Sequence, residues 1–454
     1  MKERIGAPVF WRQSNQILSP EGLVRNNFAL PGRDEPIPLG VTPVRFSPRE
    51  EQRFRRDVEV LAGVNTKALA FALRSKYYQD IILPSERDDP RTRERILEIV
   101  EKYDSFEGLY NYLERQPTLQ RPDFLVYPLP NGKVGQGLLE FNSTRPGGII
   151  LLNAAAGILQ EAGVVRQPLV PRPDMLLEFF ERIRKMRGLL SKCRVGLLWS
   201  RGYVAEIEMP RLAEVLNREA RRAGSKLEFF SAERNLLEEG DDGVVYDQDG
   251  SPVEIVYENA APPFFRFKGS DKPGASVLVN PPIMAIGDNK ALIPIYRDSG
   301  FQEYLTTEEK EVIERRVPPA HFVSGPLALD DFIRRNPVGR WVFKVTDGIK
   351  ASSGKGIDMG SEESENWLRS LRERVTEGVR VIAQQRIPPK RPWCQTSFLD
   401  SNGLQRAKNF LDCDPYVVNC GDGNYWVIGY LSRGKSSHPI NVSQGGSLGV
   451  VERR

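Results

Sequence analysis

Long hydrophobic runs are absent from this chain of 454 residues. The longest apolar stretch, from Gly147 to Leu159, is interrupted by Asn153 and is shorter than the roughly 20 residues that cross a bilayer. The N-terminus carries an acidic residue, Glu3, and no unbroken hydrophobic segment follows it, so we expect no secretory signal. The sequence therefore predicts a cytoplasmic protein that does not enter a membrane.

Cysteine and histidine are also scarce. The four cysteines show no CxxC spacing and are too few to hold a chain of this length together, so we expect reduced thiols, although Cys413 and Cys420 could meet across a hairpin. The two histidines, His321 and His438, stand far apart, which argues against a histidine-rich transition-metal site. A hard cation held by oxygen atoms is compatible with this composition.

Neither sign of charge dominates, because 64 basic and 60 acidic residues leave a net charge of +4. This sum gives no argument for binding to nucleic acid. Two basic stretches, 182–194 and 218–222, fall in predicted helices and are interpreted as solvated faces between acidic residues. We therefore expect no nucleic-acid partner.

The composition is that of a folded protein, with 40% hydrophobic and 27% charged residues. A chain of this length is expected to form about two to four packed units. Residues 1 to about 50 are rich in Pro, Gly and Arg and are expected to form an extended arm. Residues 49–116 place apolar side chains at intervals of three and four, which predicts helices. Residues 121–152 contain two extended stretches around Pro130-Asn131-Gly132, which predicts a hairpin.

Strands and helices alternate in the rest of the chain. We predict a strand over 194–200, an amphipathic helix over 209–224, a strand over 226–230 and a hairpin over 243–259 that turns at Asp249-Gly250. After about residue 277, strands such as GRWVFKVTD, VRVIAQQRI and YWVIGYLSR alternate with helices such as TEEKEVIERRV. This order predicts an α+β or mixed α/β fold with large antiparallel sheets.

Two carboxylates and an amide stand close together in the predicted hairpin. Because side chains alternate along a strand, Glu140 and Asn142 share one face, and Asp123 from the paired strand could add a third oxygen. Oxygen ligands of this kind, completed by a phosphate, suit Mg²⁺. On spacing alone, a strand-end polar cluster beside the turn Pro146-Gly147-Gly148 is the favoured interpretation.

A strand that ends near Lys344 leads into a loop rich in glycine and serine. Backbone amides freed by glycine can approach phosphate oxygens, serine hydroxyls can donate further hydrogen bonds, and lysine supplies positive charge. The order GxxxxGK[ST] is absent, so this is not a Walker loop, and a flexible surface loop is the alternative. The loop contains Asp347, Gly348, Ser352, Ser353, Gly354, Lys355 and Gly356.

A second lysine, Lys290, opens a predicted apolar helix. Most lysines are solvated surface residues, and Lys290 alone would be interpreted in that way. Its position ahead of the lysine and glycine loop, and of the strand VIAQQRI, forms a more specific order. That strand can offer backbone donors and acceptors to an adenine edge while apolar neighbours cover the ring. The candidate adenine-binding residues are Gln384, Gln385 and Ile387.

Two arginines and a polar strand end lie near the C-terminus. Arg406 and Arg433 sit on or near predicted strands and could reach an acyl phosphate or the terminal phosphate of a nucleotide, since a guanidinium group binds such groups in a bidentate manner. Each arginine alone is more often a member of a surface ion pair. Asn441, followed by Ser443 and Gly445-Gly446, is a further glycine-bearing strand end.

Taken in this order, these segments resemble the circularly permuted branch of the ATP-grasp superfamily, which includes glutathionylspermidine synthetase and related synthetase-like proteins. That family shows, in chain order, the patterns R-x-D-F, E-x-N, N-K, V-x-K-x-x-x-G, a glutamine-bearing strand and N-x-S-x-G-G. The matching positions here are Arg121, Asp123, Glu140, Asn142, Asn289, Lys290, Val342, Lys344, Gly348, Gln384, Asn441, Ser443, Gly445 and Gly446. The resemblance spans roughly residues 120 to 450.

The resemblance implies that Asp123, Glu140 and Asn142 hold Mg²⁺, and that Lys290 and Lys344 contact the phosphates of ATP. The implied reaction is ATP-dependent formation of an amide or peptide bond from a carboxylate and an amine through an acyl phosphate, with release of ADP and phosphate. In the synthetase, a run NADTP stands where this chain has NSTRPGG. Glutathione and spermidine are therefore not implied as the substrates, which are expected to be a small-molecule or peptide carboxylate and an amine.

In the same comparison, Arg121 stabilises charge on the acyl intermediate. The segment 199–208, WSRGYVAEIE, is a candidate for part of the wall that faces the acceptor, although an ordinary strand-to-helix loop is an equal interpretation. Two other activities stay open: a phosphotransferase that stops at a phosphorylated product, and a nucleotide-binding protein without turnover. A homodimer is compatible with the family.

The expected architecture is a circularly permuted ATP-grasp fold with a small Rossmann-like unit and a helical N-terminal region. Residues 1–120 would form the arm and the helices, and 121–165 the permuted ATP-grasp segment with the metal ligands. Residues 166–276 would form the Rossmann-like α/β unit that accompanies the ATP-grasp region. The nucleotide-binding region would span 277–454.

Overall fold

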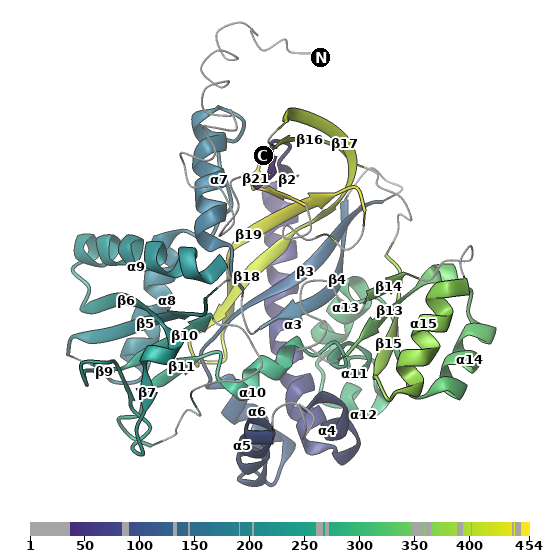
Figure 1. Cartoon of the computed structure of the whole chain (residues 1–454), viewed down its shortest axis with the longest axis horizontal. Coiled ribbons are helices and arrows are strands. Elements are labelled where there is room, and N and C mark those ends of the chain that lie inside the picture. The colour runs from purple at the N-terminus through teal and green to yellow at the C-terminus, as the bar shows by residue number, and fades with distance from the viewer. Residues whose placement is uncertain are drawn as a thin grey trace, which may run out of the picture.

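The protein has a mixed α+β fold built around one large sheet, with two four-stranded sheets beside it (Figure 1). Most of the chain is described by this computed structural model. The described residues are 37–83, 90–129, 134–143, 146–189, 191–201, 204–259, 267, 272–346, 357–359, 365–387, 394–400, 402–437, 440 and 446–454.

The large sheet mixes parallel and antiparallel neighbours. Its strands, in spatial order, are β17 (Gly403–Asp412), β16 (Cys394–Asp400), β1 (Leu39–Gly40), β20 (Ser447–Gly449), β19 (Tyr425–Lys435), β18 (Asp414–Asn419), β3 (Thr118–Pro128) and β4 (Val134–Asn142). The predicted hairpin is confirmed, because β3 and β4 pair antiparallel with Asp123 opposite Glu140. Part of the segment expected as an arm, β1, instead belongs to this sheet.

Helix α3 (Pro48–Arg74) crosses one face of the large sheet (Figure 1). Ser47 caps its first turn, since the Ser47 hydroxyl accepts from the amide of Glu50 and the Glu50 carboxylate accepts from the amide of Ser47. The buried side of the helix carries Phe54, whose ring stacks on Tyr430 with 6.0 Å between centroids and meets Phe124 edge-on at 5.1 Å. This packing fixes strands β3 and β19 against the helix.

The helices predicted over 49–116 are confirmed. They are α3 (Pro48–Arg74), α4 (Lys76–Ile82), α5 (Pro90–Glu101) and α6 (Phe106–Glu114). Helix α7 (Ile149–Glu161) follows the hairpin, and Gly148 precedes it with φ 96°, a conformation that residues with a side chain rarely adopt. The apolar run that is too short for a membrane is therefore largely a helix, and its buried side chains belong to the second core.

A parallel sheet forms the α/β unit on the left of Figure 1. Its order is β11 (Val277–Val279), β10 (Ile255–Asn259), β5 (Cys193–Trp199) and β6 (Leu227–Glu233), with α8 (Pro173–Met186) and α9 (Val204–Ala223) packed beside it. Parallel strands are typical of a Rossmann-like unit. Because β11 pairs with β10, this sheet extends past residue 276.

An antiparallel sheet with its own core lies on the other side of the large sheet (Figure 1). Its strands are β12 (Ala320–Val323), β15 (Val381–Gln385), β13 (Trp341–Val345) and β14 (Ile357–Met359), covered by α14 (Pro326–Arg335) and α15 (Glu365–Thr376). The short helices α10 (Pro282–Ala285), α11 (Leu292–Ile295) and α12 (Ser299–Gln302), the 3₁₀ turn η2 (Ile286–Asp288) and helix α13 (Thr307–Arg316) connect the parallel sheet to this one.

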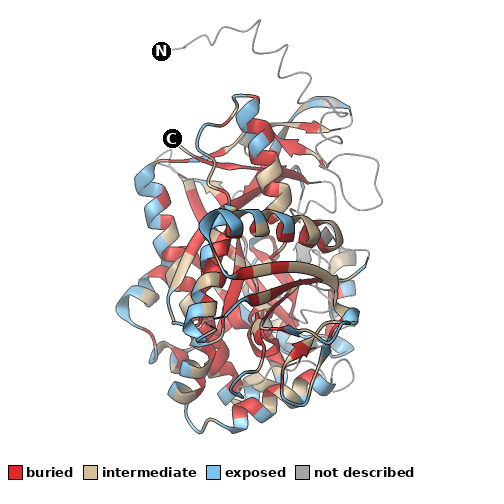
Figure 2. Ribbon diagram, turned by 90° about the vertical axis from the view of Figure 1, so that its left-hand side faces the viewer, coloured by how far each residue is buried: buried red, intermediate tan, exposed pale blue. Residues whose placement is uncertain are grey.

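The remaining strands form two small sheets, in which β2 (Val44–Phe46) pairs with β21 (Val451–Arg453), and β7 (Glu238–Glu239), β8 (Val245–Tyr246) and β9 (Pro252–Val253) form an antiparallel set. The predicted turn at Gly250 is confirmed between β8 and β9. Figure 2 shows buried residues gathered along the sheets and on the inner sides of the helices. All four cysteines are free thiols, as expected.

Candidate functional site

Side chains from three distant parts of the chain meet at the end of β4. Lys290, two residues before the start of α11, places its ammonium nitrogen 3.2 Å from Oε2 of Glu140. Both residues are largely shielded, with side-chain exposures of 7% for Lys290 and 22% for Glu140. The helix predicted after Lys290 is only the single turn α11. The lysine therefore sits at a bend in the chain, where it faces the strand.

Lys344 approaches the same strand from β13. Its Nζ donates a 2.7 Å hydrogen bond to the carbonyl of Leu139, and the residue is 3% exposed. Burial lowers the pKa of Lys344 to about 8, with Lys290 adding to the decrease while the carboxylates of Glu140 and Asp123 oppose it. Two lysines and one carboxylate thus share a small, poorly solvated volume between the large sheet and the small antiparallel sheet.

Glu140 has a buried carboxylate oxygen that forms no hydrogen bond. Its Oε2 contacts Lys290 as an ion pair but accepts no hydrogen bond within the described residues. Buried polar atoms without partners are rare in folded proteins and mark places where a ligand or ion can complete the bonding. Glu140 is therefore suited to bind a further group at this point.

An apolar surface adjoins the two lysines. Ile387 packs so close to Gly137 that a Cβ atom added there would lie 2.7 Å from Ile387 Cδ1. Gln384, near the end of β15, links that strand to β4, because its Nε2 donates a 3.1 Å hydrogen bond to the carbonyl of Leu138. The backbone amide of Gln385 donates a 2.7 Å hydrogen bond to the carbonyl of Pro319. The surrounding small cluster consists of Leu125, Tyr127, Leu139, Ile387, Phe410 and Ile440.

Asp123 is held by two guanidinium groups. Arg433 Nη2 lies 2.7 Å from Oδ2 of Asp123, and Arg121 Nε lies 3.3 Å from Oδ1. Burial alone would raise the pKa of Asp123, but the charges of Arg433 and Arg121 reverse this effect and lower it. Asp123 is consequently an ionised carboxylate whose two oxygens are both already in contact with cations.

Arg433 is the centre of a buried acidic group. Besides Asp123, its guanidinium lies 2.7 Å from Asp412 and 2.7 Å from Asp414. Burial raises the pKa of Asp412 to about 7 and raises that of Asp414 well above its ordinary value, although Arg433 opposes both changes. Arg433 therefore balances the charge of strands β3, β17 and β18. Asp412 and Asp414 could not be predicted from the sequence, since neither belongs to a recognisable pattern.

Asn142 lies beside this group, opposite Arg121. Its Nδ2 donates 3.2 Å to the carbonyl of Arg121, and it also hydrogen-bonds the side chain of Asp123. The amide nitrogen is thus engaged by β3. The side-chain oxygen is the atom of Asn142 that suits a cation.

Arg121 connects the site to the start of α7. Its Nη1 donates 2.9 Å to the carbonyl of Gly147, and its guanidinium lies 5.9 Å from the ring centroid of Tyr416. The carboxylate of Glu208 accepts from the amides of Gly148 at 2.9 Å and Ile150 at 2.8 Å, and burial raises its pKa. Glu208 ends the segment named above as a possible acceptor wall, and here it caps α7.

Arg406 is the described candidate that the fold does not bring to the others. It is exposed on β17, opposite Ser397 in β16. Five further candidates, Gly348, Ser352, Ser353, Gly354 and Asn441, lie outside the described residues. The structure thus brings together Arg121, Asp123, Glu140, Asn142, Lys290, Lys344 and Arg433, with Gln384 and Ile387 beside them.

No helix in the described part of the chain is long and apolar enough to span a bilayer. No group of three or more His, Cys, Asp or Glu side chains in it is arranged to hold a metal ion by itself. A cation at Glu140 would therefore need ligands of other kinds, such as amide, phosphate or water oxygens.

Comparison with known proteins gives similarity of fold. The sequence matches no protein-family model and no curated protein. Among solved structures, the chain is similar to a glutathione synthetase-like effector from Globodera pallida, with a TM-score of 0.63 and 12% identity over 100% of this chain and 98% of that one. A protein described as a candidate gamma-glutamylcysteine synthetase from Methylobacillus flagellatus KT gives a TM-score of 0.41 and 11% identity over 84% and 86% of the chains.

Proposed function

We propose that this protein is an ATP-dependent ligase that joins a carboxylate to an amine through an acyl phosphate, on a circularly permuted ATP-grasp fold. The observation that supports this proposal most directly is that Lys290 and Lys344, from separate elements, converge on Glu140 and its strand. The similarity of fold over the whole length to a glutathione synthetase-like effector supports the same class of protein. The substrates are a small-molecule or peptide carboxylate and an amine, acted on in the cytoplasm.

The residues at this site fit a nucleoside triphosphate such as ATP. Two ammonium groups next to each other in a buried volume repel one another, and a polyanion placed between them removes that repulsion. Lys290 and Lys344 would contact the phosphates, while Ile387 and its apolar neighbours would cover the purine beside Gln384. The candidates Gly348, Ser352, Ser353, Gly354, Gln385 and Asn441 remain part of this proposal.

The same residues fit a magnesium ion. Glu140 supplies an oxygen that lacks a hydrogen bond, and Asn142 supplies an amide oxygen whose nitrogen is held by β3. Asp123 is proposed as the third ligand, and it would have to exchange a contact with Arg121 or Arg433 for the ion. When bound, Mg²⁺ would neutralise charge on the phosphates during transfer.

The chemistry follows from the charges at the site. An oxygen of the substrate carboxylate attacks the γ-phosphorus of ATP, and ADP leaves with the electrons of the broken bond. Lys290 and Lys344 offset the charge that spreads over the transferring phosphoryl group. The amine then attacks the carbonyl carbon of the acyl phosphate, loses a proton and expels phosphate. Arg121, which contacts the carbonyl of Gly147 before α7, would stabilise the oxyanion formed in that step.

The decisive experiment measures ADP release with Mg²⁺ and ATP over a library of amino acids, peptides and polyamines, with and without hydroxylamine. Hydroxylamine intercepts an acyl phosphate and gives a hydroxamate. We expect ADP release that depends on one acid, together with its hydroxamate. ADP release with a stable phosphorylated product and no hydroxamate would identify a phosphotransferase. ATP binding without any ADP release across the library would identify a protein without turnover.

A further inference from the structure

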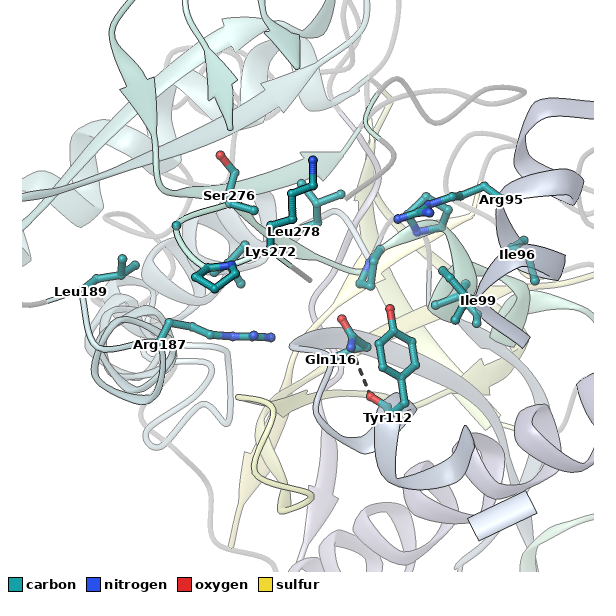
Figure 3. Close-up of a pocket in the computed structure, with 17 residues that line it drawn as sticks. Arg95, Ile96, Ile99, Tyr112, Gln116, Arg187, Leu189, Lys272, Ser276 and Leu278 are labelled. Carbon is teal, nitrogen blue, oxygen red and sulfur yellow. Dashed lines mark hydrogen bonds between the residues drawn. The ribbon is translucent and has the colours of Figure 1, made fainter. Parts of the chain in front are cut away.

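A cavity of about 230 Å³ lies between the N-terminal helices and the parallel sheet (Figure 3). Its walls come from α5, α6, the end of α8 and the segment that leads into β11 and α10. None of the candidate nucleotide-site residues that the structure describes lines it. Drug-sized ligands occupy pockets of roughly 300–1,000 Å³, so this cavity suits a smaller molecule than a nucleotide.

Among the described residues, the charged side chains that line this cavity are all basic. They are Arg95, Arg187 and Lys272, with no Asp or Glu beside them in that part of the chain. Figure 3 shows Arg95 and Arg187 on opposite walls, each with its guanidinium group directed inward. A cavity whose charged lining residues are all basic has a positive potential, which concentrates anions.

Arg187 has the least compensated charge of the three. Arg187 Nη2 donates a 3.2 Å hydrogen bond to the carbonyl of Arg115, and the side chain forms no ion pair with a carboxylate of the described residues. Arg95, by contrast, is paired with Glu98 at 3.0 Å, and Lys272 donates 2.8 Å to the carbonyl of Asp241. Arg187 is therefore free to give a bidentate contact to an anion.

The rest of the lining includes an apolar surface for the carbon skeleton of a ligand. Ile96 and Ile99 of α5 line the cavity together with Ile283 and the prolines beside it, and the three isoleucines belong to one buried apolar cluster. Gln116, at the base in Figure 3, uses its Nε2 for the carbonyl of Tyr112 at 3.2 Å. The cavity thus combines a cationic rim with an apolar side, which is the usual arrangement of a site for a small organic anion.

We propose that this cavity is a second binding site, which takes a small organic phosphate or carboxylate. The anionic group is held between Arg187 and Arg95, and the carbon body lies against Ile96, Ile99 and Ile283. The inference goes beyond the proposed ligase activity and does not depend on it. A ligand here would bridge the N-terminal helices and the α/β unit.

Isothermal titration calorimetry on the full chain tests this site with three probes: phenyl phosphate, inorganic phosphate and the neutral analogue benzyl alcohol. We expect phenyl phosphate to bind best, inorganic phosphate to bind more weakly and benzyl alcohol not to bind. Arg187→Gln should weaken phenyl phosphate by about tenfold or more, since a hydrogen bond to a charged group contributes about 1.5–3 kcal/mol. Arg95→Gln should also weaken the binding of phenyl phosphate.

Matched variants separate this cavity from other anion sites. Lys185→Gln removes an exposed charge from the last turn of the same helix, α8, and should leave the affinity unchanged. Lys344→Ala alters the candidate nucleotide site and should also leave it unchanged. Circular dichroism and the unfolding midpoint report whether Arg187→Gln folds normally. Equal binding of benzyl alcohol, or loss of phenyl phosphate in Lys344→Ala but not in a folded Arg187→Gln, overturns the proposal.

Discussion

The side-chain amide of Gln384 donates a 3.1 Å hydrogen bond to the backbone carbonyl of Leu138, 246 positions earlier in the chain. This bond joins the small antiparallel sheet to β4 of the large sheet. Lys344 makes the neighbouring connection to Leu139 at 2.7 Å. The two contacts set the distance between the sheets, and the candidate nucleotide site lies where they meet.

Replacement of Glu140 tests the proposed metal site. Glu140→Gln keeps the shape of the side chain but removes the charge, so Mg²⁺-dependent ADP formation should fall by about 10²–10³-fold. The free energy of unfolding should fall by about 1–3 kcal/mol, because the substitution removes the ion pair between Glu140 Oε2 and the largely buried Lys290. Steady-state assays over a Mg²⁺ series and thermal unfolding give both numbers.

Glu303→Gln is the matched control, since Glu303 is exposed and lies directly after α12. It should behave like the wild type in both measurements. Turnover of Glu140→Gln at the wild-type rate and with the wild-type Mg²⁺ requirement contradicts the assignment of Glu140.

The lowered pKa of Lys344 predicts how nucleotide affinity depends on pH. Because the group titrates near pH 8 in the free protein, ATP should bind with uptake of a proton, and affinity should fall as pH rises above about 8. The decrease should approach tenfold per pH unit where the lysine is neutral. Calorimetric titrations in buffers of different ionisation enthalpy measure this uptake. A flat affinity from pH 7 to 9.5 with no proton uptake is the opposing outcome.

The same burial predicts that Lys344 destabilises the free protein. The folded-state pKa of about 8 lies below the ordinary 10.5, so the unfolded chain holds the proton more tightly, and stability should rise with pH between these two values. At pH 7, Lys344→Met should therefore stabilise the protein by about 1–3 kcal/mol, less the lost hydrogen bond to Leu139. Lys310→Met, at an exposed position of α13, should not. Chemical unfolding of a destabilised Lys344→Met would refute the expectation.

Arg433 is predicted to be a structural cation in addition to any catalytic role. Arg433→Met leaves Asp123, Asp412 and Asp414 buried without their shared partner and should cost about 3–5 kcal/mol at pH 8. The loss should shrink as pH falls toward 5, since protonation removes the uncompensated charges. Unfolding curves at both pH values measure this difference. A variant of full stability that has lost only turnover would make Arg433 purely catalytic.

The local fold was largely predictable, because it depends on patterns that the sequence displays. The two extended stretches around Pro130-Asn131-Gly132 predicted the hairpin, and the periodicity after Arg49 predicted the N-terminal helices. The insertion of β1 between β16 and β20 was not predictable. Strand β1 has only two residues, which is too short to show an alternating pattern, and its pairing partners lie hundreds of positions later in the chain.

The candidate site could be predicted in its members but not in its bonding. Glu140 and Lys290 were each weak candidates alone, and their order in the chain suggested that they meet. The engagement of Asp123 by Arg433 depends on how β3, β18 and β19 pack, which spacing does not reveal. Burial likewise decides the pKa values of Asp412 and Lys344, and burial is a property of the whole fold.

The most direct measurement is the affinity of Mg²⁺-ATP for Lys290→Ala, Lys344→Ala and the double variant, determined by calorimetry beside the wild type and Lys310→Ala. Each single variant should lose about tenfold or more, because each removes an ammonium group from the same phosphate chain. The double variant should lose less than the product of the two, since neighbouring charges that share one ligand are not independent. Wild-type affinity in both single variants would contradict the account that these lysines and Glu140 form one triphosphate site.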